Sequence, residues 1–542
     1  MYKDEQHNTS VTGNRFFRGT IILTIAGIVV KVIGALNWVI LSRVLSGEGI
    51  GLYQMAFPLY LLALSISSAG IPVAVSIMTA ERLAILDYRG ANRIFKLALT
   101  MLFITGASLS LLMYIGSELL IQERLIRDPR TFYALIALSP AIFLVTIISG
   151  FRGYLQGWQI MKPTAISQIV EQVFRVGAML FFANAFLPLG IDYAAGGASL
   201  GAAAGAAAGL LVLIYYYVRL RMNQPKLAVT TTEFAVAPVS KLIRRLVALA
   251  LPVSLSSLML PLVANFDLVI VPARLEVAGY TVKQATELFG YLTGMAVPLV
   301  NLATILTGSL TVSIVPAISE AYSLGKSQLI YWRISSAIRL ANLVTIPGSA
   351  ILWLLAEPVA GIIYHAPGAA PTIKALAIAI FFLGIHQVTT GALQGLGRTA
   401  IPVINMGIAA LGKISLNWFL TAQPSLGIQG AALATVIDIA LAAALNLYFI
   451  YRYTGFVADL ADIFKNIVAA TFMAGVLILL HPTMQIYLSA PAGTLTAFFI
   501  AIAVYFLVLL AIGGLKERDI KRLPLIGEQL AKSLARLKYH FK

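Results

Sequence analysis

Long apolar stretches separated by brief polar breaks recur along the whole chain. A helix that crosses the hydrocarbon core of a bilayer needs about 20 mostly apolar residues, and about fourteen stretches meet this requirement. Their approximate cores are residues 19–43, 52–80, 94–115, 132–151, 163–187, 197–218, 246–272, 288–318, 334–356, 374–396, 400–421, 428–451, 464–481 and 493–514. The pattern predicts an all-α polytopic membrane protein with about 14 transmembrane helices.

Three of the predicted spans, 52–80, 246–272 and 288–318, are longer than a straight crossing requires. Spans of this length fit a bilayer by tilting or by kinking. Each of the three contains proline, which removes a backbone donor and bends a helix. We therefore expect bent or tilted helices at these places.

The composition agrees with a membrane protein and excludes a soluble one. Hydrophobic residues make up 59% of the chain and charged residues only 11%, whereas soluble domains carry about 25% charged residues. The chain has no cysteine, which excludes disulfides, thiolate metal sites and cysteine nucleophiles. Residues 1–18 are polar and lack the apolar run of a signal peptide, so we expect the first span to be retained.

The distribution of lysine and arginine predicts the orientation. The chain carries 39 Lys and Arg against 22 Asp and Glu. Most of the cations fall on segments that face the cytoplasm if the N-terminus is inside, as the positive-inside rule requires. An even number of spans then places both termini in the cytoplasm of a bacterial cell. The basic tail, residues 516–542, is predicted to be an amphipathic helix on the anionic inner leaflet, and a plain solvated helix is the alternative.

An internal repeat divides the chain into two halves. Residues 155–157 and 393–395 share the sequence Leu-Gln-Gly at an offset of 238 residues, and a cation, Arg175 or Lys413, follows each Gln by 19 residues. Two further matches are Pro58 with Pro298 and Glu81 with Glu320. Together the matches favour two parallel six-helix halves plus two extra C-terminal helices, an arrangement typical of transporters. Chance similarity between apolar helices is the alternative.

The repeat and the loops together predict six segments. They are a cytoplasmic N-terminus (1–18), an N-lobe of helices 1 to 6 (19–222), a cytoplasmic linker (223–245), a C-lobe of helices 7 to 12 (246–453), helices 13 and 14 (462–515) and the cytoplasmic tail (516–542).

Ionisable residues inside spans are costly and usually mark a transport pathway or an internal ion pair. The candidates for a cationic substrate cavity are Lys31, Arg43, Arg175, Arg274 and Lys413; those for helix ends or gates are Glu81, Arg152, Glu320 and Arg398; those for coupling or internal ion pairs are Glu171, Asp267, Asn417 and Asp438. Cations predominate at mid-membrane, so the cavity is expected to attract an anionic head group such as phosphate or diphosphate.

Several of these residues have a purely structural alternative. Glu171 and Arg175 are four residues apart on one helix face and could simply neutralise each other. Arginines near helix ends could extend to the interface and do nothing else. Lys31 lies about 18 Å from either end of its helix, which is too far to reach an interface easily. The glycines at 197, 201, 205 and 209 form a small-residue face that predicts close helix packing.

Signatures of enzymes and cofactors are missing from the sequence. The five histidines show no metal-ligand spacing, and no phosphate-binding loop of the P-loop type occurs. External loops are short and carry no paired carboxylates. We therefore predict a transporter that is not an enzyme, with no metal, no cofactor and no nucleic-acid partner.

Four motifs resemble a known family. They are the Leu-Gln-Gly repeat at 155–157 and 393–395, Gly-Ile-Gly-Leu-Tyr-Gln at 49–54, Gly-Ile-Pro-x-Ala-x-Ser at 70–76 and Ser-Ile-Val-Pro-Ala-Ile-Ser-Glu at 313–320. With fourteen spans, they resemble the polysaccharide-transporter branch of the MOP exporter superfamily, and within it the stage V sporulation protein B and MurJ-type lipid II flippases. The resemblance covers residues 15–515 and implies a flippase for an undecaprenyl-diphosphate-linked precursor, with a cationic cavity and a lipid-tail groove formed by helices 13 and 14.

The carried-over residues match this family only in part. The Gram-negative branch has Ser-Arg-x-x-Gly-x-x-Arg-Asp in its first span; here Lys31 keeps the first cation, whereas Asn37 stands at the second arginine. We expect Arg43 to supply the missing charge. Some relatives bind sodium with a seventh-span acid, which corresponds to Asp267, and an eleventh-span Asn, where this chain has Lys413. A lysine would repel sodium, so we expect Asp267 to pair with Lys413 and sodium binding to be lost.

The resemblance thus implies a flippase for lipid II in peptidoglycan synthesis, with membrane lipids and cell-wall synthesis proteins as further partners. Alternatives are an exporter of another lipid-linked polysaccharide unit or a multidrug antiporter of the same superfamily. A membrane glycan polymerase would need a catalytic carboxylate in a substantial external loop, and a scaffold would have little use for lysines at mid-membrane.

Overall fold

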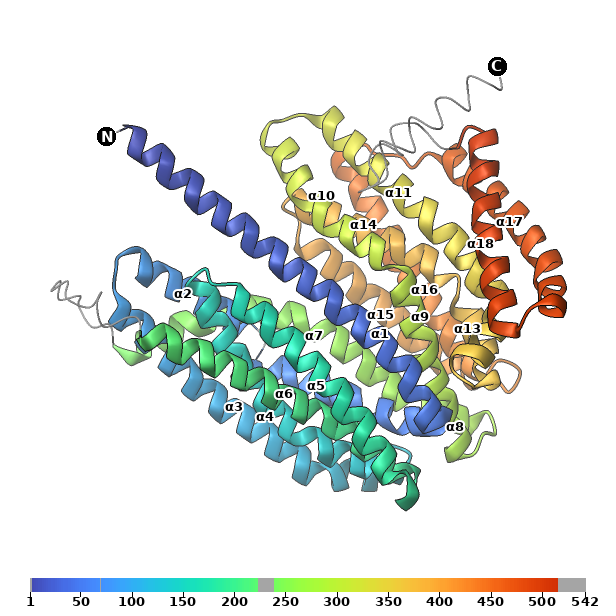
Figure 1. The fold of residues 1–542 in the computed structure, drawn as a ribbon, viewed down its shortest axis with the longest axis horizontal. Helices are drawn as coiled ribbons and strands as arrows, with labels where there is room; N and C mark the ends of the chain where they lie inside the picture. Colours follow the sequence, from blue (N-terminus) through green and yellow to red (C-terminus); the bar gives the residue numbers. More distant parts are fainter. Residues whose placement is uncertain (1, 69, 223–237, 515–542) are drawn as a thin grey trace. The chain divides into compact units, whose positions relative to one another are not determined.

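The computed structural model describes residues 2–68, 70–222 and 238–514 (Figure 1). Every regular element in these residues is a helix, so the predicted all-α polytopic class is confirmed. The chain packs as two compact units, Met1–Gly290 (unit 1) and Tyr291–Lys542 (unit 2). The predicted amphipathic tail (516–542) and most of the predicted linker lie outside the described residues.

The described part of unit 1 contains eight α-helices and two short 3-10 turns. The helices are α1 (Tyr2–Ser68), α2 (Ile71–Ala84), α3 (Tyr88–Gln122), α4 (Phe132–Gly157), α5 (Lys162–Phe186), α6 (Ile191–Met222), α7 (Val239–Val277) and α8 (Val282–Gly290), and the turns are η1 (Pro129–Thr131) and η2 (Leu187–Leu189). The two units are divided by their packing, after α8 at Gly290. The predicted N-lobe and C-lobe are divided by the sequence repeat, at the linker 223–245, and they stay a prediction.

Unit 2 is more broken in its first part than in its last. It contains the π-helical turn η3 (Tyr291–Ala296), α9 (Val297–Ala303), α10 (Ile305–Ser323), α11 (Ser327–Leu354), α12 (Ala356–Pro358), the π-helical turn η4 (Val359–Ile363), the 3-10 turn η5 (Pro367–Ala369), α13 (Ala370–Leu376), α14 (Ala379–Gly395), α15 (Ala400–Leu420), α16 (Ile428–Thr454), α17 (Leu460–Tyr487) and α18 (Ala490–Ala511).

The described residues contain 12 helices that are long and apolar enough to cross a membrane, or 13 if the pair Pro367–Leu376 and Ala379–Gly395, bent by 46°, is one span. One of the twelve, Val29–Ala84, has 56 residues and would be roughly 84 Å long as a straight helix, over twice the roughly 30 Å hydrocarbon core. It contains the second predicted span, 52–80, and part of the first, 19–43. The count of fourteen stays a prediction.

The boundaries of the early spans differ from the predicted ones. The expected break between the first two spans is present, because the non-helical backbone of Ser46 (φ 56°, ψ −176°) divides α1 into two helices. A second break lies inside predicted span 52–80, where Gly70 takes a left-handed conformation (φ 75°) and α2 begins directly after it with Pro72 in its first turn. Predicted span 288–318 is likewise divided between α8, the π-helical turn, α9 and α10.

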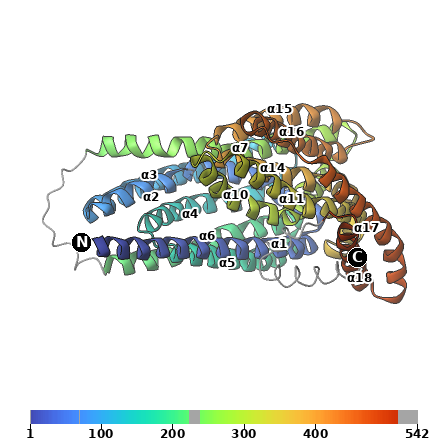
Figure 2. The same ribbon diagram turned by 90° about the horizontal axis from the view of Figure 1, so that it is seen from above.

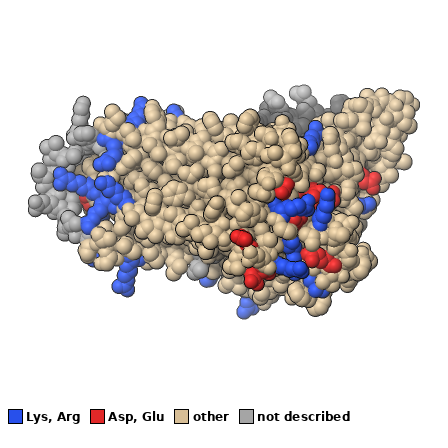
Figure 3. Space-filling view, turned by 90° about the horizontal axis from the view of Figure 1, so that it is seen from below, with Lys and Arg blue, Asp and Glu red and all other residues tan. Residues whose placement is uncertain are grey.

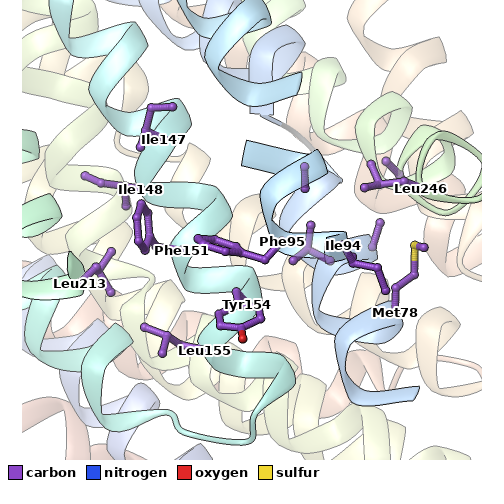
Figure 4. Close-up of a cluster of buried hydrophobic side chains, with 14 of the residues drawn as sticks. Met78, Ile94, Phe95, Ile147, Ile148, Phe151, Tyr154, Leu155, Leu213 and Leu246 are labelled. Carbon is purple, nitrogen blue, oxygen red and sulfur yellow. The ribbon is translucent and has the colours of Figure 1, made fainter. Parts of the chain in front are cut away.

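The core of unit 1 joins α2, α3, α4, α6 and α7 through large buried side chains. Phe95 of α3 packs against Phe151 and Tyr154 of α4, with ring centroids 5.1 and 4.5 Å apart (Figure 4). Met78 of α2 and Leu246 of α7 belong to the same cluster. This core fixes the position of α4, which carries one residue of the candidate site.

The outer surface is apolar over much of its area. Leu112 and Ile115 of α3 and Phe181 of α5 are each about two-thirds exposed, as expected for side chains that face lipid. On the face shown in Figure 3, residues other than Lys, Arg, Asp and Glu make up most of the surface, and the charged residues form separate groups on it. This pattern agrees with a multi-pass membrane protein.

The glycine face of α6 packs against α5, as predicted from its spacing. α1, α5 and α6 run side by side (Figures 1 and 2). A Cβ atom added at Gly205 would lie 2.5 Å from the carbonyl oxygen of Glu171 and 2.7 Å from Cβ of Arg175. The glycines therefore let α6 approach the part of α5 that carries two candidate site residues.

Gly205→Ala is expected to destabilise the protein by about 1–3 kcal/mol, because a methyl group at this position forces α5 and α6 apart. The measurement is the unfolding temperature of the protein in detergent. Gly177→Ala on α5 is the matched control, since its Cβ would meet nothing within 4 Å, and a helical Gly→Ala change in open space is neutral or slightly stabilising. Equal unfolding temperatures for the two variants would contradict the packing role of Gly205.

Candidate functional site

One buried carboxylate holds two guanidinium groups in unit 1. Glu171 on α5 is 8% exposed. Its Oε2 accepts a hydrogen bond from Nη2 of Arg152 on α4 at 2.8 Å, and its Oε1 accepts one from Nη2 of Arg175. Arg152 also donates to the hydroxyl of Ser167 at 3.2 and 3.3 Å. We call Arg152, Glu171 and Arg175 the arginine cluster; it carries one excess positive charge.

The helical repeat of α5 explains how the cluster forms. Ser167, Glu171 and Arg175 are spaced four residues apart and therefore line one face of the helix. The predicted ion pair between Glu171 and Arg175 is confirmed. The pair does not neutralise the site, because Arg152 joins it from another helix. Sequence spacing gives no sign of this third member.

The guanidinium of Arg175 keeps an unused donor. Its Nε is buried and has no hydrogen-bond partner among the described residues, although 23% of the side chain is exposed. A buried N–H group without an acceptor costs free energy, so it is a ready donor to an anionic ligand. Tyr53 and Tyr60 of α1, each 2% exposed, lie within electrostatic range of this guanidinium. The cluster therefore lies beside an aromatic wall.

α1 carries two further predicted cations, Lys31 and Arg43, and both are exposed. Midway between them, Asn37 is only 6% exposed and donates from Nδ2 to Sδ of Met179 on α5 at 3.0 Å. Its Oδ1 has no partner among the described residues. Lys31 and Arg43 each lie roughly 9 Å along the axis from Asn37. The structure therefore places both cations on the helix that packs along α5, but not in the arginine cluster.

The other cavity and coupling candidates are divided between the two units. Asp267 and Arg274 are half-buried on α7 of unit 1. Lys413 and Asn417, one turn apart on α15 of unit 2, are 6% and 1% exposed, and Asp438 on α16 is half-buried. Each unit is described by itself, so the pairing of Asp267 with Lys413 stays a prediction.

The helix-end candidates Glu81 and Glu320 each pair with an arginine of another helix in their own unit. Glu81, in the last turn of α2, pairs with Arg245 of α7 at 2.8 Å. Glu320, in the last turn of α10, pairs with Arg333 of α11 at 3.1 Å. The other two helix-end candidates are Arg152, which belongs to the arginine cluster, and Arg398, which lies exposed just beyond α14.

A second charged network surrounds the kink in α1. We call it the kink network; it consists of Glu48, Arg127, Asp128, Arg130, Glu276, Lys283 and Thr286. Glu48 pairs with Arg130 and with Nζ of Lys283, the latter at 3.0 Å. Asp128 accepts a hydrogen bond from Oγ1 of Thr286 at 2.8 Å. These contacts connect α1 and the segment before α4 to α7 and α8.

The sequence analysis missed the kink network because its members are far apart along the chain. Arg130 is 82 residues from Glu48, and Thr286 is 158 residues from Asp128. One signal was present: Glu48 stands between two glycines directly after Ser46. A lone acid where the backbone bends indicates a partner on another segment.

Guanidinium groups are the hydrogen-bond donors that the arginine cluster offers to a ligand. Such groups bind phosphate oxygens well, because the planar arginine fork can donate two parallel hydrogen bonds. No group of three or more His, Asp or Glu side chains is placed to hold a metal ion in the part of the chain that the structure describes.

Comparison with known proteins identifies the family. A model described as polysaccharide biosynthesis protein matches residues 16–322, more than half of the chain. The chain is 32% identical to stage V sporulation protein B of Bacillus subtilis (strain 168) over 523 residues, which are 94% of this chain and 98% of that protein. The chain belongs to the polysaccharide biosynthesis protein family. A MatE model also matches residues 292–419, and the predicted membership of the MOP superfamily is confirmed.

Two further relatives extend this result. Lipid II flippase MurJ of Bacillus subtilis (strain 168) is 24% identical to this chain. The alignment covers 82% of this chain and 84% of lipid II flippase MurJ. A solved structure of lipid II flippase MurJ in an inward closed conformation matches with a TM-score of 0.68 at 16% identity, covering 93% of this chain and all of the other. The structural match shows a shared fold.

Proposed function

We propose that this member of the polysaccharide biosynthesis family is a flippase for an undecaprenyl-diphosphate-linked cell-wall precursor, lipid II. It moves the precursor across the bacterial cytoplasmic membrane by alternating access, for peptidoglycan synthesis. The observation that carries the proposal is the arginine cluster, in which one carboxylate serves two guanidinium groups within apolar helices. The kinship with lipid II flippase MurJ supports the choice of substrate.

The arginine cluster suits a diphosphate because it is only partly neutralised. Before substrate arrives, Glu171 makes two cations tolerable in a medium of low dielectric constant. An incoming diphosphate offers more acceptor oxygens than one carboxylate does, so Arg175 donates to it through Nε and Nη, while Arg152 stays on Glu171 and Ser167. Arg152 thus keeps its carboxylate while the excess charge of Arg175 meets the diphosphate, which lowers the cost of moving the head group.

The kink network closes the external side of the transporter under this proposal. With a cytoplasmic N-terminus, the kink in α1 lies at the external surface, and the network connects the predicted N-lobe to α7 and α8 of the predicted C-lobe. Release of substrate to the outside then requires these contacts to break. Ionic contacts with one shared carboxylate can form and break without a large change in packing.

Glu48→Gln is expected to favour the externally open state by about three- to tenfold, because the change removes the acceptor shared by Arg130 and Lys283. The reporter is Ala285→Cys on α8, which is 1% exposed and lies in a chain without natural cysteine. Its labelling rate with an impermeant maleimide should rise accordingly. Glu123→Gln, at an exposed acid of the same external segment, is the control. Equal labelling rates in the two variants would refute this role of the network.

The predicted orientation completes the proposal. Both termini lie in the cytoplasm, α17 and α18 flank the path of the lipid tail, and cell-wall synthesis proteins receive the product outside. The abundance of exposed apolar side chains supports the multi-pass arrangement, and the asymmetry of lysine and arginine supports its direction.

A second candidate is an exporter of another lipid-linked polysaccharide unit of the same superfamily. The observation that favours it is the identity of 32% to stage V sporulation protein B, against 24% to lipid II flippase MurJ. A multidrug antiporter is favoured only by the MatE match to residues 292–419, and the excess of cations at the arginine cluster suits an anionic substrate better than a cationic drug.

The deciding experiment depletes the protein and measures which lipid-linked precursor becomes trapped on the inner leaflet. We expect lipid II to accumulate inside and its externally accessible fraction to fall. If lipid II reaches the outside normally while another glycan stays inside, the second candidate replaces the first. If precursors appear outside but stay unpolymerised, a polymerase function replaces transport.

Transport is expected to change less than about twofold when sodium is replaced by choline, because the buried Lys413 repels a cation at the position where relatives have an Asn ligand. The measurement is lipid II translocation in proteoliposomes. Lys413→Asn removes the competing charge and should introduce a sodium dependence if Asp267 lies nearby. Strong stimulation of the unmodified protein by sodium would contradict the proposed pairing of Asp267 with Lys413.

A further inference from the structure

The fourth helix of each half ends in the same way, which fixes the register between α4 and α14. Each helix is followed by a left-handed residue, Gln159 (φ 57°) and Gly397 (φ 77°). The next amide donates to the carbonyl five residues back, at 3.1 and 2.9 Å respectively. This is the Schellman arrangement. In this register Trp158 of unit 1 corresponds to Leu396 of unit 2.

The ends of α2 and α10 match in the same manner. The left-handed residues are Leu86 (φ 62°) and Gly325 (φ 65°), and the following amides donate five residues back at 2.8 and 3.0 Å. Tyr88, the first residue of α3, therefore corresponds to Ser327, the first residue of α11. The two junctions can be compared side chain by side chain.

Aromatic rings fill the space between these junctions in unit 1. Tyr88 stacks on Trp158 with centroids 5.8 Å apart, and Trp158 meets Tyr154 edge-on at 6.3 Å. Phe95 packs against Tyr154, with ring centroids 4.5 Å apart (Figure 4).

The same place in unit 2 is a cavity of about 210 Å³. Every aromatic residue of the unit 1 set has a smaller counterpart: Ser327 for Tyr88, Ala392 for Tyr154, Leu396 for Trp158 and Ile334 for Phe95. We call this space the α10–α16 cavity; it is lined by Tyr322, Gly325, Ser327, Ile330, Leu396, Arg398, Tyr453 and Thr454.

Arg398 gives this cavity a positive charge. Its guanidinium lies over the ring of Tyr453, 4.9 Å from the centroid, in a cation–π contact that fixes its position. Among the described residues, no ion pair joins Arg398 to a carboxylate. Ser327 and Tyr453, which carry hydroxyl groups, also line the cavity. An arginine with hydroxyls around an open space is suited to a phosphate oxygen.

The size and position of the cavity limit which ligands can bind in it. Pockets for drug-sized molecules measure about 300–1,000 Å³, so about 210 Å³ takes one phosphate group and a small attachment rather than a disaccharide–peptide. The cavity lies at the ends of α10, α14 and α16, which all reach the inner-leaflet surface in the proposed orientation. Phosphates of anionic lipids are concentrated at that depth.

We propose that the α10–α16 cavity binds the phosphate head group of an anionic glycerophospholipid of the inner leaflet, with Arg398 as its principal ligand. The site is separate from the arginine cluster of unit 1. It rests on the proposed orientation but not on the identity of the transported precursor. A bound lipid here would attach the ends of α10, α14 and α16 to the membrane surface.

The test titrates the purified full-length protein in detergent with phosphatidylglycerol and counts bound lipids by native mass spectrometry. Arg398→Gln should weaken the tightest binding about tenfold. Ser327→Tyr with Leu396→Trp copies the aromatic pair of unit 1 into the cavity and should have the same effect without lowering the unfolding temperature. Arg452→Gln removes an exposed cation beside Tyr453 that does not line the cavity and should change binding less than twofold.

Three results would overturn the proposal. The first is unchanged phosphatidylglycerol binding by Arg398→Gln. The second is equal binding of phosphatidylcholine, which would show that net charge is not recognised. The third is equally tight, Arg398-dependent binding of soluble glycerol phosphate or of undecaprenyl phosphate alone, which would assign the cavity to a different phosphate source. Binding is read without transport, so failure of this proposal is distinguishable from failure of the flippase proposal.

Discussion

Arg175→Gln is expected to lower lipid II translocation in proteoliposomes by about 10- to 100-fold. A charge-assisted hydrogen bond contributes about 1.5–3 kcal/mol, which corresponds to this range. The substitution removes the unpartnered Nε donor and the excess positive charge, while Glu171 keeps its contact with Arg152. The protein should therefore still insert and fold. The measurement is the rate at which a fluorescent lipid II becomes accessible to an external quencher.

Two further variants distinguish the paired hydrogen-bond donors of the Arg175 guanidinium from its positive charge. Arg175→Lys keeps the charge but not the two parallel donors, so we expect an intermediate rate. Lys162→Gln removes an exposed cation from the first turn of the same helix and should leave the rate within twofold of the unmodified protein. Translocation by Arg175→Gln at the unmodified rate would remove the arginine cluster from the substrate path.

Most of the fold could be predicted from the sequence because the bilayer imposes it. Apolar runs of spanning length and the absence of any alternative to helix in lipid were enough to predict an all-α membrane protein. The boundaries were predicted less well. The break at Gly70 depends on a backbone conformation that hydropathy does not report, so predicted span 52–80 runs across it. The break at Ser46, in contrast, falls in the predicted gap between spans 19–43 and 52–80.

The candidate site was predictable only where its members share one helix. Glu171 and Arg175 are one turn apart, so their ion pair followed from spacing. Arg152, in contrast, reaches the pair from α4, a helix whose position is fixed by a core of residues from α2, α3, α6 and α7. The kink network needs contacts over 82 and 158 residues, and no local pattern encodes such distances.

The repeat explains a gap of the sequence analysis. The helix ends at Gln159 and Gly397 share local geometry, whereas the two six-helix halves stay a prediction. Whether a junction is filled depends on several side chains together, such as Tyr88 and Trp158 in one half against Ser327 and Leu396 in the other. A comparison of motifs alone does not detect the resulting cavity.

Glu171→Gln is expected to destabilise the protein by about 3–5 kcal/mol, the range measured when one partner of a buried ion pair is removed. The neutral amide leaves two guanidinium groups close together among apolar helices without a negative charge between them. Of the two residues that now accept hydrogen bonds from Arg152, Glu171 and Ser167, only Ser167 is unchanged. The measurement is the free energy of unfolding in detergent or bilayer discs, together with the yield of folded protein.

The double variant Arg152→Gln with Glu171→Gln distinguishes charge balance from packing. It restores one excess cation, Arg175, and should recover at least half of the lost stability, since the repulsion between guanidinium groups disappears. Glu118→Gln, at an exposed acid of α3 that accepts a hydrogen bond from Gln122, should cost less than about 0.5 kcal/mol. If Glu171→Gln were as mild as Glu118→Gln, the carboxylate would not be what makes two mid-membrane arginines tolerable, and the proposed exchange between Glu171 and a diphosphate would lose its basis.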